Sequence, residues 1–409
     1  MNSSETQIPE SRAARRRKNR IMREQRRRRR TAYITGLVCA LFVIVLTALS
    51  TLTPDKTFSA NENRNLRQRP DFSMDGLMRG NFFSDTATHF SDQFALRDRW
   101  ISLKLAYDKL IGMRESHDVY LGKDHYLLQK TVEPDTKALD DIANAVNSFA
   151  SLHSGLSTRM LVVPCAAAVL PDKLPGSAPV RDQAADIDAF GQRLSGVTFT
   201  NASEALRSSN DSRNLFYRTD HHWTSYGART VYEKCAPGLG IDAPVTEFDE
   251  YLLSETFLGT LGSQSGSFRR RDTIEIYVPK ECPNYYVYYA DQGKTVSSLY
   301  VRDKLNEKDQ YQVFLGGNHP IVEIHTAAAS GRSLLIFKDS YANSFVQYLI
   351  PHYDTIIMID PRYYFNRLDN VIQANGITDV LFLYSANTLL ADHSLAVCLN
   401  ASASERRNE

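Results

Sequence analysis

An aspartate, two adjacent histidines and a tryptophan occupy consecutive positions in the stretch FYRTDHHWTSYGA, residues 216–228. In an extended segment, residues two apart share a face, so Asp220 and His222 are expected to point the same way and His221 the other. A carboxylate beside a histidine can accept the Nδ1–H, which fixes the tautomer and leaves Nε2 free to take a proton. Trp223 could pack on the ring and restrict it. The pattern predicts an acid–base pair.

Two other interpretations of the histidines stay open. Adjacent histidines on a strand face opposite sides and rarely share one ion, and the helical histidine pairs of zinc enzymes are four residues apart. We therefore expect no metal and no cofactor here. The remaining alternative is a polar turn in which both rings are satisfied structurally, which is also how we interpret His125 and His319 at the surface.

A second cluster lies in LLIFKDSYANSF, residues 334–345, where an apolar strand runs into Asp339 and Ser340 and then a helix. A serine at the first turn of a helix lies in its positive N-terminal field, and backbone N–H groups there can hold a developing oxyanion. Serine becomes a nucleophile when an adjacent base takes its proton, and His222 oriented by Asp220 would be that base. The alternative is that Ser340 or Asp339 only caps the helix.

A third stretch, YQVFLGGNHP at 311–320, places Gly317 and Asn318 after an apolar run that we interpret as a strand. Backbone N–H groups and an asparagine amide are usual oxyanion stabilisers. Asn343, one helical turn beyond Ser340, is another candidate donor. A plain turn at the end of a strand explains the same residues without any chemistry.

Continuous apolar strands alternate with helices after residue 119, which predicts an α/β domain with a parallel sheet covered by helices on both faces. Ligands of such sheets bind beyond the carboxyl ends of the strands, and both polar clusters follow predicted strand ends or loops. The expected elements are a hairpin at 118–130 turning at 122–124, a helix at 138–153, a strand at 159–163, a helix near 181–194, a strand at 197–201, a helix in 228–240, strand–turn–helix–strand over 333–364 and helix–strand–turn over 371–390.

The charge of the chain is unevenly spread, and this indicates a membrane topology. Residues 1–30 carry twelve Lys and Arg against three acidic residues, and residues 31–53 carry no charge and are mostly apolar. At ~1.5 Å per residue such a helix crosses a bilayer, and basic segments stay on the cytoplasmic side. We expect a single-pass protein of the cell membrane with a cytoplasmic N-terminus, in which Arg26–Arg30 contact anionic lipid and the main domain is extracytoplasmic. Cleavage as a signal peptide is an alternative.

The expected organisation is a basic segment at 1–30, a transmembrane helix at 31–53, a linker and helical arm at 54–118, the α/β domain at 119–400 and a polar tail at 401–409. Within the arm, residues 74–114 are expected to be helical, with an apolar stripe that packs on the main body. The basic segment lacks the interleaved aromatic residues of an RNA-binding arm, so no nucleic acid partner is expected. Outside the cell the cysteines would meet oxidising conditions, so one or two disulfides and free buried thiols are both open for Cys165, Cys235, Cys282 and Cys398.

Asp220–Trp223 spells DHHW, and the chain resembles the bacterial DHHW family over roughly residues 55–400. Further stretches carry the resemblance: ENRNLRQRP, DQFALRDRW, YLLQK, LVVPCAAAVLPDKLP, TFLGTLGSQSG, YQVFLGGNHP, LLIFKDSYANSF and DVLFLYSANTL. That family is similar to the SGNH-hydrolase-like polysaccharide O-acetyltransferases of the alginate acetylation type. In those proteins, too, Asp-x-His comes early in the chain and the nucleophilic serine late. The resemblance implies an SGNH-hydrolase-like, flavodoxin-like sheet with a Ser340–His222–Asp220 triad. Lys338 stands where the Gly-Asp-Ser pattern has glycine.

The resulting hypothesis is a membrane-anchored extracytoplasmic O-acyltransferase or esterase that acts on a cell-envelope glycan. By analogy with the same family, a membrane acyl-donor protein would be its partner. The alternative is a non-catalytic glycan-binding or envelope-assembly protein on the same fold, for which the tyrosine-rich stretch NYYVYY at 284–289 would stack on sugar rings; an ordinary strand explains that stretch as well.

Overall fold

The computed structural model describes residues 12–209 and 213–406. The first eleven residues of the predicted basic segment and the last three of the predicted tail lie outside the described residues. The chain divides into two compact units. One comprises the described residues up to Ser59 together with Arg64–Arg99, and the other comprises Ala60–Asn63 and the described residues from Trp100 onward.

The first unit is dominated by the helix α1 (Arg12–Leu52), which runs without a break from the basic segment through the apolar one. Residues Arg15–Leu52 are long and apolar enough to cross a membrane, by length and composition. The rest of this unit is a two-stranded ribbon, β1 (Phe58–Ser59) with β2 (Arg64–Asn65), and the helices α2 (Met74–Met78) and α3 (Asn81–Asp92).

The predicted helix over 74–114 is divided into three. Gly80, with φ of 76°, separates α2 from α3, and Leu96, with φ of 60°, precedes α4 (Arg97–Leu110). A left-handed residue interrupts the helical hydrogen-bond pattern, so the expected continuous apolar stripe is wrong. Phe83 and Phe90 are exposed. In the second unit Leu105 of α4 packs in a small apolar cluster with Val119, Leu121, Leu127 and Leu261.

An eight-stranded sheet forms the centre of the second unit, in the order β11-β10-β12-β14-β13-β15-β6-β7. The five strands β14, β13, β15, β6 and β7 are parallel, and β12, β10 and β11 are antiparallel at one side, so the sheet is mixed where a parallel one was expected. Its strands are β6 (Ser157–Val163), β7 (Thr198–Asn201), β10 (Tyr285–Tyr289), β11 (Lys294–Val296), β12 (Ile321–Thr326), β13 (Ser333–Lys338), β14 (Thr355–Ile359) and β15 (Asp379–Ser385).

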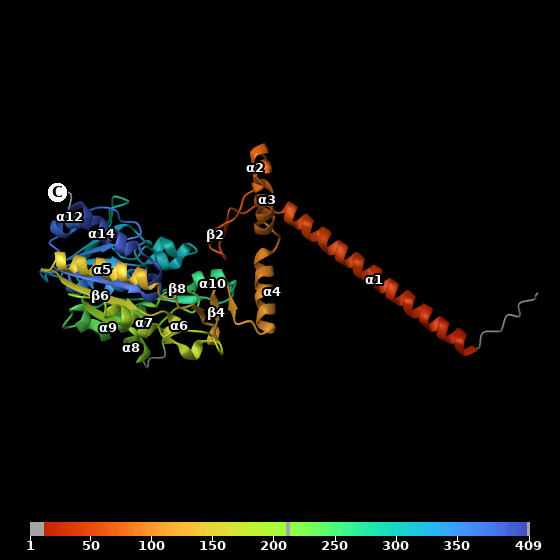
Figure 1. The fold of residues 1–409 in the computed structure, drawn as a ribbon, viewed down its shortest axis with the longest axis horizontal. Coiled ribbons are helices and arrows are strands. Elements are labelled where there is room, and N and C mark those ends of the chain that lie inside the picture. The colour runs from red at the N-terminus through yellow and green to blue at the C-terminus, as the bar shows by residue number, and fades with distance from the viewer. Residues whose placement is uncertain (1–11, 210–212, 407–409) are drawn as a thin grey trace, which may run out of the picture. The chain divides into compact units, whose positions relative to one another are not determined.

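The central parallel strands are buried on both faces because helices cover each face, whereas the edge strand β7 is half-buried to exposed. Alternate residues of β13 show this: Leu334 and Ile336 enter one apolar cluster, and Leu335 and Phe337 enter another. In Figure 1, α5 and α14 lie over one face and α9 over the other. The face of α5 also has α7, α12 and α13, and the face of α9 has α6, α8 and α11. The bounds are α5 (Thr136–Leu152), α6 (Ala166–Val169), α7 (Gln183–Gly191), α8 (Ser203–Arg207), α9 (Ser225–Cys235), α11 (Tyr341–Phe345), α12 (Leu368–Ala374), α13 (Ala386–Ala391) and α14 (Ser394–Arg406).

Two smaller sheets flank this core. The predicted hairpin is confirmed as β4 (Val119–Leu121) and β5 (Leu127–Gln129), joined by a turn at Lys123–His125 and extended by β3 (Glu115–Ser116). A long hairpin of β8 (Phe248–Phe257) and β9 (Asp272–Pro279), with α10 (Thr260–Ser265) between its strands, was not predicted. Besides the turn at Lys123–His125, the short 3₁₀ segments of the described residues are Pro171–Lys173, Ala236–Leu239, Arg302–Asn306, Gln310–Val313, Val346–Tyr348 and Ile350–His352.

The cysteines adopt the free-thiol alternative. Within the described residues Cys165, Cys235 and Cys398 are buried and unpaired, and Cys282 is half-buried and unpaired.

A pair of stacked rings on the neighbouring parallel strands β13 and β15 can be used to test the assigned hydrophobic core. The Phe337 and Phe382 rings stack with centroids 5.0 Å apart, and both side chains are fully buried. We expect Phe382→Ala to lower the free energy of unfolding by about 3–5 kcal/mol, because it removes apolar contacts and leaves a cavity. The same substitution at Phe365, which is 81% exposed, is the matched control and should change it by less than ~0.5 kcal/mol. Denaturant unfolding of the detergent-solubilised chain measures both, and equal losses would contradict the assigned core.

Candidate active site

Asp220, His222 and Ser340 form one hydrogen-bonded row. The Nδ1 of His222 lies 2.5 Å from Asp220 Oδ1, and its Nε2 lies 2.7 Å from Ser340 Oγ. Asp220 is 2% exposed and His222 6%, whereas Ser340 is half-buried. Residues 118 positions apart in the sequence thus meet at one end of the sheet.

The partners fix the protonation pattern of the imidazole. A carboxylate can only accept, so His222 carries its hydrogen on Nδ1 and donates it to Asp220. The Nε2 lone pair then accepts the hydroxyl hydrogen of Ser340. This is the arrangement in which a histidine can remove a proton from a serine as the serine attacks.

The loop that carries Asp220 and His222 is a tight turn, not the extended segment predicted. Phe216 and Trp223 form an isolated antiparallel bridge, and the Tyr217 N–H donates to the His222 carbonyl at 3.2 Å. Asp220 and His222 are nevertheless together, because the His222 backbone N–H also donates to Asp220 Oδ1 at 3.0 Å. The loop is anchored from β9 by the Asp272 carboxylate, which accepts from the backbone N–H groups of residues 218 and 219 and from the Thr219 hydroxyl.

The second oxygen of Asp220 is held by a segment forty residues further along the chain. Thr260 donates its backbone N–H at 2.7 Å and its hydroxyl at 3.0 Å to Asp220 Oδ2. Only glycine fits before it, since a Cβ at Gly259 would lie 2.3 Å from the Cβ of Asp220. Burial opposes ionisation of Asp220, but the two neighbouring histidines and these hydrogen bonds outweigh burial and hold its pKa well below the usual range.

The same hydrogen bonds bear on metal binding. Ligand atoms of Asp220, His221 and His222 lie within 4.8 Å of one another. Both carboxylate oxygens already accept from N–H or O–H donors, and His222 Nε2 faces Ser340. Because these atoms already have hydrogen-bond partners, their arrangement is that of an acid–base pair and not that of a metal site with open lone pairs.

The ring that restrains His222 is Tyr311, not Trp223. The Tyr311 and His222 rings are stacked, with centroids 3.8 Å apart and planes 10° from parallel. Trp223 is fully buried under the serine helix, where its Nε1–H donates to Ser344 Oγ at 3.0 Å and to the Tyr341 carbonyl at 3.1 Å. His221 does not point away as predicted, because its ring lies 3.9 Å from that of His222.

Ser340 follows the last residue of β13 by two positions and precedes the short helix α11. Asp339 fixes this corner: one carboxylate oxygen accepts the Tyr341 N–H at 2.9 Å and the other accepts the Ser385 N–H at 2.9 Å. Ser340 is the N-cap residue of α11 but makes no capping hydrogen bond with its side chain; its hydroxyl is directed to His222 instead. The Tyr341 N–H is occupied, which leaves the Ser340 N–H as the backbone donor beside the hydroxyl.

The glycine–asparagine loop reaches the same edge of the sheet because β12 is antiparallel. The first residue of β12, Ile321, pairs with Ile359 at the carboxyl end of β14. The preceding segment is a 3₁₀ turn and an isolated bridge rather than the predicted strand. Gly317, with φ of 116°, bends the chain in a conformation that favours glycine.

Of the predicted donors, Asn318 is exposed and Asn343 is buried. Asn343 donates its two N–H groups to the Gly317 carbonyl at 3.2 Å and to Asn318 Oδ1 at 3.1 Å, so it ties the loop to the serine helix and has none left for a ligand. The Gly317 carbonyl is an acceptor in this contact. Asn318 therefore has the free side-chain N–H groups of this cluster.

The remaining predicted histidines lie apart from this row. His125 is exposed. His319 is buried rather than at the surface, and both ring nitrogens are satisfied, by Asp291 at 2.9 Å and by the Leu315 carbonyl at 3.0 Å.

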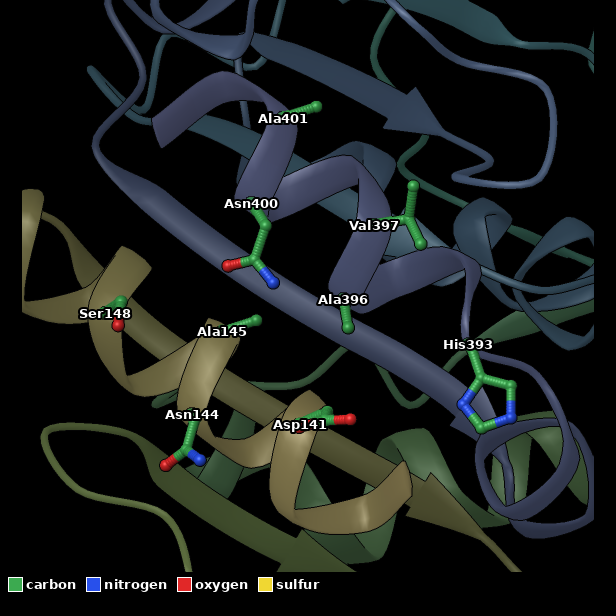
Figure 2. A pocket seen from close by; sticks show the side chains of 9 residues that line it. All are labelled: Asp141, Asn144, Ala145, Ser148, His393, Ala396, Val397, Asn400 and Ala401. Atoms are coloured by element: carbon green, nitrogen blue, oxygen red, sulfur yellow. The ribbon is translucent and has the colours of Figure 1, made fainter. Parts of the chain in front are cut away.

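A broad open groove of about 820 Å³ lies elsewhere on the second unit, between α5 and α14 (Figure 2). Figure 2 shows Asp141, Asn144 and Ser148 projecting from α5, opposite Asn400 of α14. No residue of the hydrogen-bonded row lines it. Size alone does not mark the chemical site of this chain.

Sequence reasoning missed Thr260, Tyr311 and Asp272. The first two lie within stretches that carry the family resemblance, TFLGTLGSQSG and YQVFLGGNHP, and this was the only signal for them. Asp272 gave no signal, because its role depends on a hairpin that was not predicted.

The chain is similar to known proteins in sequence and in fold. Residues 119–299 match the family described as SGNH hydrolase-like domain, acetyltransferase AlgX, a stretch that contains Asp220 and His222. The fold is similar to that of a DHHW family protein from Eubacterium siraeum, with a TM-score of 0.60 and 24% identity, covering 69% of this chain and 95% of that one. It is also similar to PatB1 from Bacillus cereus, solved with a sulfonyl adduct, with a TM-score of 0.55 and 19% identity, covering 68% of this chain and 97% of that one.

No curated protein sequence matches the chain. The predicted resemblance is confirmed, and so is the fold class: an SGNH-hydrolase-like fold with a sheet dominated by parallel strands and flanked by helices, preceded by one helix that is a candidate membrane span.

Stability should depend on pH through His221. Burial and the charge of His222 lower the pKa of His221 to about 4 from 6.5, although Asp220 acts in the opposite direction. Between these values the unfolded chain binds a proton that the folded chain does not, so stability falls as pH is lowered from about 6.5 to about 4. We expect His221→Gln to remove about 1–3 kcal/mol of this fall, the lower part of the range because the side chain is 29% exposed.

Thermal unfolding at pH 7.0 and pH 4.5 measures the effect. His393→Gln, at an exposed position, is the matched control. Parallel pH curves for wild type and His221→Gln would contradict the assignment.

Proposed function

We propose that this chain is a membrane-anchored extracytoplasmic O-acyltransferase or esterase that acts on a cell-envelope glycan through Ser340, His222 and Asp220. The observation that carries the proposal is the continuous hydrogen-bonded row, with 2.7 Å from the serine oxygen to the imidazole and 2.5 Å from the imidazole to a buried carboxylate. The acetyltransferase-type fold supports acyl transfer as the reaction class.

In the first half-reaction Ser340 Oγ attacks the carbonyl carbon of an acyl ester, and His222 Nε2 takes the hydroxyl proton. The imidazolium that forms is stabilised by the ionised Asp220, whose pKa is held low by the contacts described above. The tetrahedral intermediate collapses when His222 gives the proton to the leaving oxygen, which leaves the acyl group on Ser340. In the second half-reaction a sugar hydroxyl or water gives its proton to His222 and takes the acyl group.

The developing oxyanion needs hydrogen-bond donors at Ser340. The backbone N–H of Ser340 and the side-chain NH₂ of Asn318 are the donors that fit this role. Donors of this kind act in acyl transfer by stabilising charge that exists only in the transition state. Tyr311 contributes by keeping the imidazole plane fixed, since its ring stacks on His222 and its hydroxyl donates to the Ser340 carbonyl at 3.2 Å and to Ser344 Oγ at 3.0 Å.

The location of the substrate follows from the membrane helix. The apolar part of α1 anchors the chain in the bilayer, its basic part stays cytoplasmic, and the second unit lies outside, where the glycans of the envelope are. By analogy with the polysaccharide O-acetyltransferases of the alginate acetylation type, a membrane protein that delivers an acyl donor across the bilayer is the proposed partner.

The triad makes a direct prediction for ester turnover. With a chromogenic acetyl ester, Ser340→Ala and His222→Ala should each lower kcat/KM by about 10³-fold or more, and Asp220→Asn by about 10²-fold or more, because each removes a part of one relay. Ser333→Ala, a serine at the opposite end of β13, is the matched control. Equal turnover by wild type and Ser340→Ala would remove Ser340 from the mechanism.

The same variants separate the enzyme from the non-catalytic alternative. A serine-reactive phosphonate should label the wild type at Ser340 and fail to label His222→Ala at the same rate, because only an activated hydroxyl reacts. Glycan binding by the wild type without labelling would favour a binding protein instead, for which the exposed Tyr286 of β10 is the stacking candidate.

The membrane topology makes a separate prediction. The full chain should remain in the membrane fraction after alkaline extraction, whereas a chain without residues 1–53 should be released, because the apolar helix supplies the insertion energy. Protease added outside intact spheroplasts should digest the second unit and spare the basic segment. Digestion of a tag at the N-terminus under those conditions would reverse the assigned orientation, and a soluble mature form lacking the helix would show that it is a cleaved signal.

A further inference from the structure

Lys338 is a charged residue buried next to the proposed nucleophile. It is the last residue of β13 and is 1% exposed. Its Nζ lies 3.0 Å from Asn318 Oδ1 and 3.4 Å from Asp360 Oδ2. A buried ammonium group is costly unless its hydrogens have acceptors, so a lysine at this position requires an explanation.

Compensation of Asp360 does not explain it. Arg362 already binds the Asp360 carboxylate with two hydrogen bonds, of 2.8 Å and 2.6 Å, in the two-pronged geometry that suits a carboxylate. Asp360 has one charge and Arg362 matches it. The shorter contact of Lys338 is the one to the neutral side chain of Asn318.

The strand order brings these groups together. Neighbouring strands run β12-β14-β13, and Asn318 precedes β12, Asp360 follows β14, and Lys338 ends β13. Since β12 is antiparallel to the other two, its beginning lies at the same edge as their carboxyl ends. Asn318, Asp360 and Lys338 therefore stand side by side at the edge where Ser340 lies.

The chemistry of the partners fixes which end of the Asn318 amide faces them. An ammonium group only donates, so the atom of Asn318 that faces Lys338 must be the oxygen. Asn343 reaches the same oxygen through a nitrogen that is itself identified by its contact with the Gly317 carbonyl, which only accepts. With its oxygen held by two donors, the amide presents its NH₂ on the opposite side.

We propose that Lys338 is a positioning residue that holds the Asn318 amide so that its NH₂, and not its oxygen, faces the acyl oxygen bound at Ser340. The terminal torsion of an exposed asparagine is broad and nearly two-fold, so without a constraint the side chain would present its oxygen part of the time. An oxygen facing a developing oxyanion repels it, whereas a fixed N–H stabilises it without reorganisation. The inference rests on the proposed function.

The test is a double-substitution cycle on ester turnover by the full chain in detergent, with a chromogenic acetyl ester. We expect Asn318→Ala and Asn318→Asp each to lower kcat by about 10²-fold with KM changed less than about threefold. Asn318→Asp is the sharper variant, because it keeps an acceptor for Lys338 and replaces the NH₂ donor by a charged carboxylate oxygen that can only accept. Lys338→Met, which keeps the side-chain length, should lower kcat by about tenfold or more, again with little change in KM.

The effect of combining the two substitutions distinguishes a positioning role of Lys338 from a structural role. If Lys338 acts through Asn318, Lys338→Met should cause no further loss of kcat in the Asn318→Ala background. Lys280→Met, at an exposed lysine paired with Glu247, is the matched control and should leave kcat unchanged. Equal fractional losses in both backgrounds, or an undiminished kcat in Lys338→Met, would overturn the inference.

A second readout does not depend on activity. In chain labelled with ¹⁵N-asparagine, the side-chain amide pair that disappears in Asn318→Asp should be sharp in wild type and broadened or averaged in Lys338→Met. An unchanged signal would overturn the positioning role even if turnover falls through misfolding. A different outcome separates the two proposals. If the amide signals are sharp and depend on Lys338 but turnover does not depend on Ser340, the proposed function is rejected and the positioning of Asn318 by Lys338 stands.

Discussion

The negative charge of Asp220, held away from water, is the constraint on which the rest of the site depends. A buried carboxylate stays ionised only when N–H and O–H donors replace its hydration. Here the donors come from His222, from its own turn and from Thr260, forty residues along the chain. The close approach of that segment requires glycine at position 259. The charge of Asp220 therefore requires the turn around it, the loop that carries Thr260 and the Nδ1–H tautomer of His222. In that tautomer the lone pair of Nε2 is free to face Ser340.

The sheet provides the second constraint, because it decides which loops can meet. Parallel strands present their carboxyl ends at one edge, so Ser340 after β13 and Asp360 after β14 are neighbours by topology. The antiparallel β12 then brings the preceding loop, with Asn318, to that edge from the other direction. Had β12 been parallel, the residues before it would lie at the far end of the sheet. The departure from the expected all-parallel sheet is therefore the feature that places an amide donor beside the serine.

The sequence predicted the features that depend on local patterns of residues. It did not predict those that depend on packing between distant segments. Uninterrupted apolar runs such as 334–337 identified the central strands, and the rule that strand ends converge placed Ser340 at one edge of the sheet. The loop with Asp220 and His222 meets it there. Alternating side chains predict an extended segment at 217–224, but this segment is a turn. The single bridge that closes the turn leaves no pattern in the sequence. The apolar run around Tyr311 resembles a strand, but its packing against Tyr217 and Phe257 makes it a 3₁₀ turn whose tyrosine stacks on the imidazole. Thr260 acts through a contact that no local spacing encodes.

Charged groups on both sides of Ser340 show how such a site departs from what stability alone would select. Asp220 lies on the imidazole side, and Lys338, with its neighbours Asp360 and Arg362, on the side of the amide donor. Burial lowers the pKa of Lys338, the attraction of Asp360 opposes that shift, and Arg362 adds to it. Replacing a buried ion cluster by apolar side chains of similar volume is often neutral or stabilising. The buried ions next to this half-buried hydroxyl are therefore better explained by fixed orientation of donors and acceptors at that hydroxyl than by a contribution to folding.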